Sequence, residues 1–445
     1  MNATERTSRP ILSKPIIARG LLLIFAFTAW SITGPAYVAL ALLVALFLTE
    51  IPGQWRHLRR EPAFLLLLAV VLVTSLLAVR AAWIFPAIAT DQWRAISAWS
   101  APLLFFVIAW WLHRDPTQIW PVLGAAALGL ACGVLRKSDW SLLPEILGGM
   151  RYDFGFAALG LAFLASVVLV GLVLFRPRIT GLRIGGRARP GAGWIFWSLG
   201  IVLSLFVLVV TQSRGAAMSL ALAGVLYAII RRREARRRGQ QSPRQLRLAL
   251  AAAALAIALA GALLWVTKHR QVEDWQAITV GSQEELSYTG SVTIRLNLIK
   301  VGFQTFAQQP LLGFGPGTST TEFLVPERVV AVDAYQLANA PAASHLHSVA
   351  MEILTRFGLV GVLIATLLLW VLLRAYRGLW SGPRAAPDLR AFLTLGGIML
   401  LLYCLYDFRV VNLDLRFFCI LFLGVLYSFQ LGRVRQADGA EPAHD

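Results

Sequence analysis

The sequence is dominated by about twelve long apolar blocks, separated mostly by short charged connections. An α-helix rises about 1.5 Å per residue, so a block of about 20 residues can cross a hydrocarbon core about 30 Å thick. Hydrophobic residues make up 58% of the 445 residues and charged residues 14%, with a mean hydropathy of +0.67. These values exclude a water-soluble enzyme, and the blocks are too long for barrel strands. We therefore predict an all-α polytopic membrane protein.

The apolar blocks give the expected domain organisation. We place the spans at 21–32, 35–50, 63–79, 98–112, 120–135, 154–175, 194–211, 215–230, 248–266, 349–373, 391–406 and 417–431. Accordingly, residues 1–266 form a transmembrane bundle of nine spans, 267–348 form a long loop, 349–431 hold the last three spans, and 432–445 form a tail.

The distribution of positive charge predicts the orientation of the chain. With the N-terminus inside, most of the 41 Lys and Arg residues fall in the inner connections and at the termini. The run from Arg231 to Arg238 is the strongest such anchor. The positive-inside rule therefore places both termini in the cytoplasm and the loop 267–348 on the outer side. The net charge of +18 reflects this orientation, and we expect no nucleic-acid partner.

The long outer loop contains an amphipathic segment followed by a glycine-rich turn. Ser291 to Gln308 is typical of an amphipathic helix that carries Arg295 on the face of Ile299. Three glycines follow, at Gly313, Gly315 and Gly317. Such a turn either presents backbone N–H groups to an anion or is only a structural corner, and the sequence leaves both interpretations open.

Two of the six histidines, His345 and His347, lie where the tenth span begins. If the helix has already started there, the two side chains point about 160° apart and do not chelate one metal together. An imidazole with an ordinary pKa of about 6.5 is suited to general base catalysis. The alternative is an interfacial histidine that is hydrogen-bonded to loop backbone.

Two arginines occupy unusual positions on the outer side. Arg214 follows Ser213 in a turn of a few residues between the seventh and eighth spans, and Arg151 opens the sixth span. Arginine near hydrocarbon is unfavourable unless a partner or a wet cavity accommodates it, although either side chain could extend to a lipid phosphate. With Arg295, they place three guanidinium groups, which suit phosphate, on one membrane face.

The sequence predicts neither a metal nor another cofactor. The acidic residues near these candidates are scattered, and no cluster of converging oxygen ligands is visible. Cys132, Cys404 and Cys419 all fall in apolar blocks, so neither a disulfide framework nor a thiolate site is indicated. The charge of an anionic substrate would therefore be neutralised by arginine.

The order of these motifs resembles the O-antigen ligase and O-antigen polymerase superfamily. The resemblance covers about residues 211–361: Ser213-Arg214-Gly215, then Arg295, the turn from Gln309 to Gly317, His347-Ser348, and Gly358 to Gly361. Members often have Asn after the histidine, where this chain has Ser348, so the choice between His347 and His345 stays open.

The resemblance implies a bundle-type glycosyltransferase of the bacterial inner membrane, with its active site facing the periplasm. The ligase branch joins O-antigen, carried on undecaprenyl pyrophosphate, to the lipid A core in lipopolysaccharide biosynthesis, without metal or nucleotide. Carried over to this chain, Arg214 and Arg295 would bind the pyrophosphate and His347 would take the proton of the acceptor hydroxyl. Arg151 is added on physical grounds, and Ser213 and the three glycines would support the site. Besides these substrates only membrane lipids are expected as partners, and the oligomeric state is not predicted.

Other functions share part of this pattern. An O-antigen polymerase or a protein O-oligosaccharyltransferase would use the same donor and differ in the acceptor. A secondary transporter also fits twelve spans, but it predicts two similar halves, whereas the long loop after the ninth span makes these halves unlike. A lipid-binding scaffold without catalysis would retain the arginines and would not need the histidine.

Overall fold

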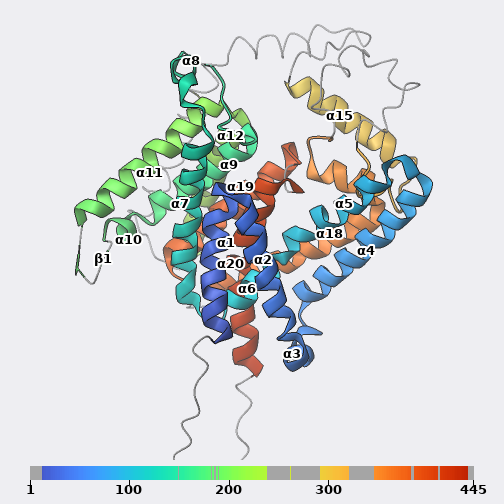
Figure 1. Ribbon diagram of the computed structural model, residues 1–445, viewed down its shortest axis with the longest axis horizontal. Coiled ribbons are helices and arrows are strands. Elements are labelled where there is room, and N and C mark those ends of the chain that lie inside the picture. The colour runs from blue at the N-terminus through green and yellow to red at the C-terminus, as the bar shows by residue number, and fades with distance from the viewer. Residues whose placement is uncertain are drawn as a thin grey trace, which may run out of the picture.

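The computed structural model describes residues 13–148, 150–181, 183–184, 187–188, 190–237, 261, 291–319, 345–381, 385–408 and 411–438. Most of these residues lie in long helices that run side by side (Figure 1). Within these ranges the one β-ladder is the antiparallel pair of β1 (Arg183–Ile184) and β2 (Arg187–Ala188). The predicted all-α membrane protein is therefore confirmed in its fold class.

Each predicted span except the ninth falls in one or two helices. These helices are α1 (Lys14–Ser31), α2 (Thr33–Leu48), α4 (Pro62–Ile84), α5 (Ala89–Ser100) with α6 (Phe105–Leu112), α7 (Ile119–Lys137), α9 (Ala158–Leu174), α11 (Pro190–Thr211), α12 (Arg214–Arg237), α18 (Val349–Ser381), α19 (Pro387–Tyr406) and α20 (Leu413–Asp438). The ninth, at 248–266, lies outside the described residues apart from residue 261.

Fewer helices meet a strict length and hydropathy criterion for crossing a membrane. Eight segments of the described chain do so, or nine if α2 and α3 (Ile51–Leu58), which meet at 78°, form one broken span. The apolar helix α9 and the apolar part of α12 are shorter. A multi-pass membrane protein is thus established, whereas the total of twelve spans stays a prediction.

The remaining described elements are short connections and one loop helix. The connections are η1 (Pro86–Ile88), η2 (Ala101–Leu104), η3 (Pro116–Gln118), η4 (Trp140–Leu142), α8 (Leu143–Leu147) and α10 (Arg176–Thr180). The loop helix is α15 (Ser291–Phe306), which confirms the helix predicted before the glycine-rich turn.

Small residues allow the helices to pack closely. A Cβ atom added at Gly129 of α7 would lie 1.9 Å from the carbonyl oxygen of Phe27, and one at Gly133 would lie 2.4 Å from that of Trp30. A Cβ atom at Gly424 of α20 would likewise meet α6. Close backbone approach of this kind provides the van der Waals contact that holds helices together in lipid, where the hydrophobic effect between them is absent.

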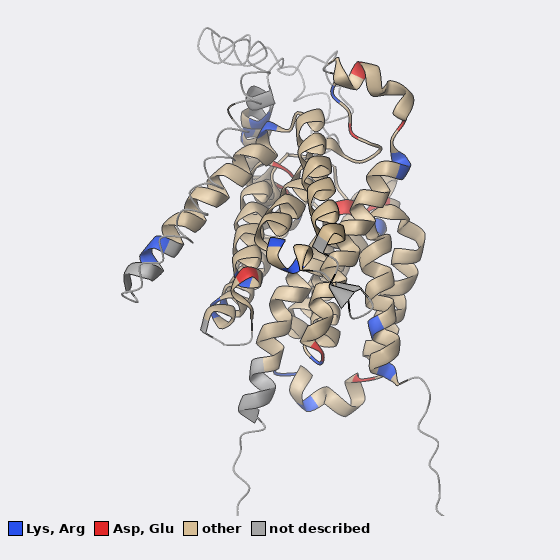
Figure 2. Cartoon of the chain, turned by 90° about the vertical axis from the view of Figure 1, so that its left-hand side faces the viewer, with Lys and Arg blue, Asp and Glu red and all other residues tan. Residues whose placement is uncertain are grey.

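The helices also define two ends of the molecule. The start of α1 and the end of α20 lie at the same end, opposite to α15 (Figure 1). The first described helix thus begins, and the last one ends, on the same side of the molecule (Figure 1). Charged residues are separated by long uncharged stretches of helix (Figure 2). Near the start of α1, Glu50 accepts hydrogen bonds from Lys14 at 3.1 Å and from Arg114 at 2.7 Å. The assignment of this end to the cytoplasm remains a prediction from the charge distribution.

Candidate active site

The segments that carry the predicted site residues meet at the end of α19. This helix ends at Tyr406, and the next residue, Asp407, is extended and completely buried. The hydroxyl group of Tyr403 donates to Oδ2 of Asp407 at 2.6 Å, and the amide of Phe408 donates to Oδ1 at 2.8 Å. A carboxylate buried beside a membrane helix is unfavourable unless its oxygens are hydrogen-bonded, and these two bonds fix its position.

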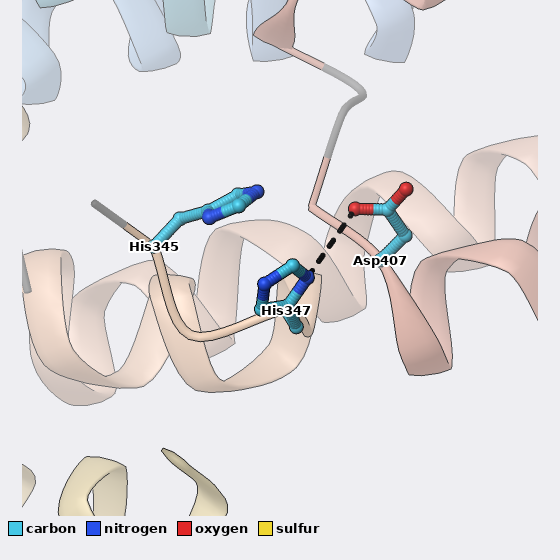
Figure 3. A group of neighbouring side chains, drawn as sticks. All are labelled: His345, His347 and Asp407. Carbon is cyan, nitrogen blue, oxygen red and sulfur yellow. Dashed lines mark ion pairs between the residues drawn. The ribbon is translucent and has the colours of Figure 1, made fainter. Parts of the chain in front are cut away.

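His345 and His347 lie beside this carboxylate (Figure 3). Nδ1 of His347 is 4.0 Å from Oδ1 of Asp407, and the side chain of His347 is 15% exposed. The two imidazole rings have centroids 4.2 Å apart and are tilted by 47°. The expectation that the two histidines would point apart required a helix at these positions and is wrong, because α18 begins only at Val349.

The backbone of His347 is in an unusual conformation. Its φ angle is +50°, a region that residues with a side chain rarely adopt. Such conformations persist only where the surrounding structure determines them, and they are concentrated at functional sites. We define residues 345–348 as the histidine loop.

A buried ion pair holds the histidine loop against α18. The amide of Leu346 donates to Oε1 of Glu352 at 2.5 Å, and the other oxygen of Glu352 pairs with Nε of Arg356. Arg356 in turn donates to the carbonyl oxygen of Pro316 at 2.8 Å. Both members are buried, and their pairing and hydrogen bonds offset the desolvation of the charges. The ion pair therefore joins the histidine loop to the glycine-rich turn.

Arg295 reaches the same position from α15. Its Nε donates to the carbonyl oxygen of Tyr406 at 3.3 Å, one residue before Asp407. The helix α15 packs on α18 through an apolar cluster that includes Leu298 and Met351. A Cβ atom at Gly302 would lie 3.2 Å from the sulfur of Met351, so the glycine allows this close packing. The loop helix thus brings Arg295 to the end of α19.

The start of α12 contacts the other side of Tyr406. Arg214 is the first residue of α12, and Ser213 caps the helix, because its hydroxyl oxygen accepts from the amide of Ala216 at 3.4 Å. A Cβ atom at Gly215 would lie 2.6 Å from the ring of Tyr406. Ser219 and Tyr406 join through their hydroxyl groups at 3.0 Å. The α12 terminus and α15 thus contact the same tyrosine.

Arg151 lies next to the start of α12 rather than next to the histidines. Its Nε donates to the carbonyl oxygen of Thr211, the last residue of α11, at 3.1 Å. The neighbouring amide of Tyr152 donates to the carbonyl oxygen of Val210 at 3.3 Å. Arg151 is therefore held at the α11–α12 turn by Thr211, which precedes Arg214 by three residues.

The glycine-rich turn, residues 309–318, is a packing corner. The amide of Gly313 donates to Gln309, that of Gly315 to the carbonyl oxygen of Arg356, and that of Gly317 to the side chain of Gln92. These three N–H groups are therefore occupied by protein acceptors rather than presented to an anion. The supporting role predicted for the three glycines is consistent with this position.

The glycine-rich turn packs against α18 where this helix is interrupted by a kink. Gly358 has φ +60° and ψ −151°, so the helix is kinked there. The amides of Leu359 and Val360 donate instead to the carbonyl oxygens of Pro310 and Leu311, at 2.8 and 3.3 Å. A Cβ atom at Gly358 would lie 2.5 Å from the Leu311 carbonyl group. The backbone of the turn thus substitutes for the missing hydrogen bonds of the helix.

Asp407 is the residue that the sequence analysis did not identify. It lies 60 positions after His347 in the sequence. One signal was present: an acidic residue directly follows the apolar block that ends near Tyr406. With the two histidines, it forms the group of described residues whose ligand atoms all lie within 4.8 Å of one another.

A comparison with known proteins supports the resemblance noted in the sequence. A search of curated proteins finds no significant match. A family model described as O-antigen ligase matches residues 199–366. The matched range contains Arg214, Arg295 and His347, which the structure places around the end of α19. Residues 199–366 are therefore similar to the O-antigen ligase family, in the part of the chain where the motif order predicted the resemblance.

Proposed function

We propose that this protein transfers a glycan from undecaprenyl pyrophosphate to a hydroxyl group of the lipid A core, at the periplasmic face of the inner membrane. The family consists of glycosyltransferase-like membrane enzymes, which act on lipid-linked glycans. The observation that carries the proposal is the position of His347 beside the buried carboxylate of Asp407, at the helix end that Arg295 also contacts.

His347 acts as the general base in this proposal. A neutral imidazole has one nitrogen that carries hydrogen and one that accepts a proton. The acceptor hydroxyl oxygen bonds to the anomeric carbon, the bond from that carbon to the pyrophosphate oxygen breaks, and His347 takes the hydroxyl proton. This single displacement inverts the anomeric centre.

Asp407 positions the base and stabilises its charge. Nδ1 of His347 is the atom nearest to the carboxylate, so Nε2 is the nitrogen that faces away from it. A fixed negative charge beside Nδ1 orients the ring and stabilises the imidazolium that forms during transfer, as the aspartate does in serine hydrolases. The pairing with Asp407 favours His347 over His345 as the base.

The arginines neutralise the departing pyrophosphate. Negative charge grows on the leaving group in the transition state, and preplaced guanidinium groups stabilise it without a divalent cation. Arg295 and Arg214 come from the two helices that contact Tyr406, and Arg151 is anchored beside the start of α12. The N-terminus of α12 adds the positive end of a helix dipole.

Purified protein in lipid nanodiscs tests the proposal. The donor is offered with lipid A core, with a second repeat-unit lipid or with a pilin-like peptide as acceptor. We expect transfer to lipid A core, unimpaired by EDTA. Transfer only to the repeat-unit lipid would identify a polymerase, and transfer only to the peptide a protein O-oligosaccharyltransferase.

The variant His347→Ala tests the base, with donor binding and transfer measured separately. We expect donor binding to persist and the transfer rate to fall by about 10²- to 10⁴-fold. His57→Gln, in α3, is the matched control and should change neither quantity. Loss of both donor binding and transfer, or of neither, would contradict a base role for His347.

A further inference from the structure

We propose that His345, His347 and Asp407 form a binding site for a borderline divalent cation, of which Zn²⁺ is the probe, and that the bound ion inhibits transfer. The binding part stands on the geometry of the three side chains alone. The inhibitory part rests on the function proposed above. The ion is thus an inhibitor at this site and not a cofactor of the reaction.

The three side chains are close to the spacing that a metal ion requires. Zn²⁺ binds imidazole nitrogen and carboxylate oxygen at about 2.0–2.2 Å, so two ligand atoms of a tetrahedral site lie about 3.4 Å apart. The ligand atoms here all lie within 4.8 Å of one another, and Nδ1 of His347 is 4.0 Å from Oδ1 of Asp407. The three side chains lie close together (Figure 3), and the proposal requires side-chain rotations that shorten these separations to the spacing of metal ligands.

The ligand set selects the class of ion. Two imidazoles and one carboxylate suit Zn²⁺ and other late divalent transition metals, and three protein ligands leave a position open for water or substrate. Mg²⁺ and Ca²⁺ prefer sites made of oxygen ligands, so neither is expected to bind. The site therefore discriminates by the chemistry of its donors rather than by charge alone.

The surrounding structure holds the ligands before any ion arrives. Tyr403 and the amide of Phe408 bind the carboxylate of Asp407, which is the outer-shell support that metal-ligating carboxylates usually have. Glu352 fixes the histidine loop through the amide of Leu346. The unusual backbone of His347 is therefore maintained by the fold, and little ordering remains for the binding step.

An ion at this position removes the base. When Nδ1 of a neutral imidazole coordinates a metal, Nε2 carries the hydrogen, and neither nitrogen can accept a proton. The ion also takes the carboxylate oxygen that would otherwise stabilise the imidazolium. His347 can then no longer accept the proton of the acceptor hydroxyl group, so transfer stops. The donor can still bind to the arginines.

Calorimetry and activity together test the proposal on the full-length protein in nanodiscs. The protein is first stripped with a chelator and then titrated with ZnCl₂, and transfer is measured over the same concentrations. We expect one Zn²⁺ per chain, parallel loss of transfer, recovery on addition of EDTA, and no effect of MgCl₂. X-ray absorption of the Zn²⁺ complex should show two imidazole ligands and one carboxylate ligand.

The variant His345→Gln removes one ligand and leaves His347 and Asp407 in place. We expect its affinity for Zn²⁺ to fall by at least about tenfold. Its inhibition, relative to its own metal-free rate, should shift to higher Zn²⁺ by the same factor. His57→Gln is the control, and it should bind Zn²⁺ as the unaltered protein does.

The possible results separate the two proposals. Absence of Zn²⁺ binding, or a spectrum without two imidazoles, overturns the metal site, while metal-free transfer would still support the proposed function. Binding of Zn²⁺ without any loss of transfer overturns the inhibition. A stripped protein that is inactive until Zn²⁺ is restored overturns metal-independent catalysis and the inhibition together, and supports the site itself.

Discussion

Two non-helical segments contact α18: the histidine loop, which precedes it, and the glycine-rich turn, which packs against its kink. Their polar groups are used in different ways. In the glycine-rich turn, the amides of the three glycines donate to protein acceptors, and Arg80 donates to the carbonyl oxygen of Gly313 at 2.9 Å. In the histidine loop, two imidazoles lie beside a buried carboxylate. Both segments are rich in residues that could bind an anion or a metal. The hydrogen bonds within the protein distinguish the segment that holds the fold from the segment suited to chemistry.

Substitution of Asp407 should have the largest effect on activity. Asp407→Asn keeps the shape of the side chain but removes the charge beside Nδ1 of His347. We expect kcat to fall by about 10²- to 10⁴-fold, equivalent to about 3–5 kcal/mol, with little change in KM for the donor. Steady-state kinetics and donor binding measure the two effects. An equal loss of donor binding would show that the substitution disturbs the donor site and would contradict a role confined to the base.

Substitution in the glycine-rich turn should lower the stability of the protein. Gly315→Ala places a Cβ atom 2.2 Å from the Cβ of Ala81, at a φ angle of +108°. Overpacking and backbone strain should together lower the free energy of unfolding by about 2–4 kcal/mol. Thermal unfolding in micelles measures the loss. The transfer rate per folded molecule should remain near that of the unaltered protein, and a selective loss of donor binding would revive the anion interpretation of the turn.

A smaller loss of stability is expected at Gln92. Its side chain is fully buried, accepts from the amide of Gly317 at 2.8 Å and donates to the hydroxyl oxygen of Thr318 at 2.8 Å. Gln92→Leu leaves the buried amide of Gly317 without its acceptor and removes the bond to Thr318, whose hydroxyl group keeps its bond to the carbonyl oxygen of Phe314. The free energy of unfolding should therefore fall by about 1–3 kcal/mol. Gln54→Leu in α3, where the side chain is half-buried, serves as the control for thermal unfolding. An unchanged unfolding temperature would show that Gln92 does not hold the turn.

The smallest effect should come from His345. Its ring contacts those of His347 and Phe408, but the contact with the carboxylate oxygen of Asp407 is made by His347. Without metal, we expect His345→Gln to reduce transfer by less than about tenfold, which is under about 1.4 kcal/mol. Rates of His345→Gln and His347→Ala, measured side by side, check this order. The reverse order would make His345 the base.

The positions of the helices could be predicted well from the sequence. The residues that come together at the helix ends could not. Continuous apolar blocks determine membrane helices, because backbone groups in lipid must be hydrogen-bonded within the segment. The helix that carries Arg295 and the arrest of that helix before Pro310 were also predictable from local pattern. Local pattern does not determine where a helix starts to within a few residues, and for this reason the relative direction of His345 and His347 was mispredicted.

Asp407 shows the limit of local pattern more clearly. Its proximity to His347 depends on the packing of α19 against segments 60 or more residues earlier in the chain. The pair Glu352 and Arg356, four residues apart on one helix, was visible in the sequence. The role of this pair in joining the histidine loop to Pro316 could not be predicted from local pattern, because Pro316 lies 40 residues from Arg356.

The kink at Gly358 fixes the glycine-rich turn to α18. Two amides of α18 are satisfied by carbonyl oxygens of the turn, at Pro310 and Leu311. Movement of the turn away from α18 would break both hydrogen bonds, and each amide left unsatisfied in a nonpolar environment would cost several kcal/mol. The turn is thus fixed to α18, and the lipid-linked donor that we propose would have to reach the histidines without breaking these two hydrogen bonds.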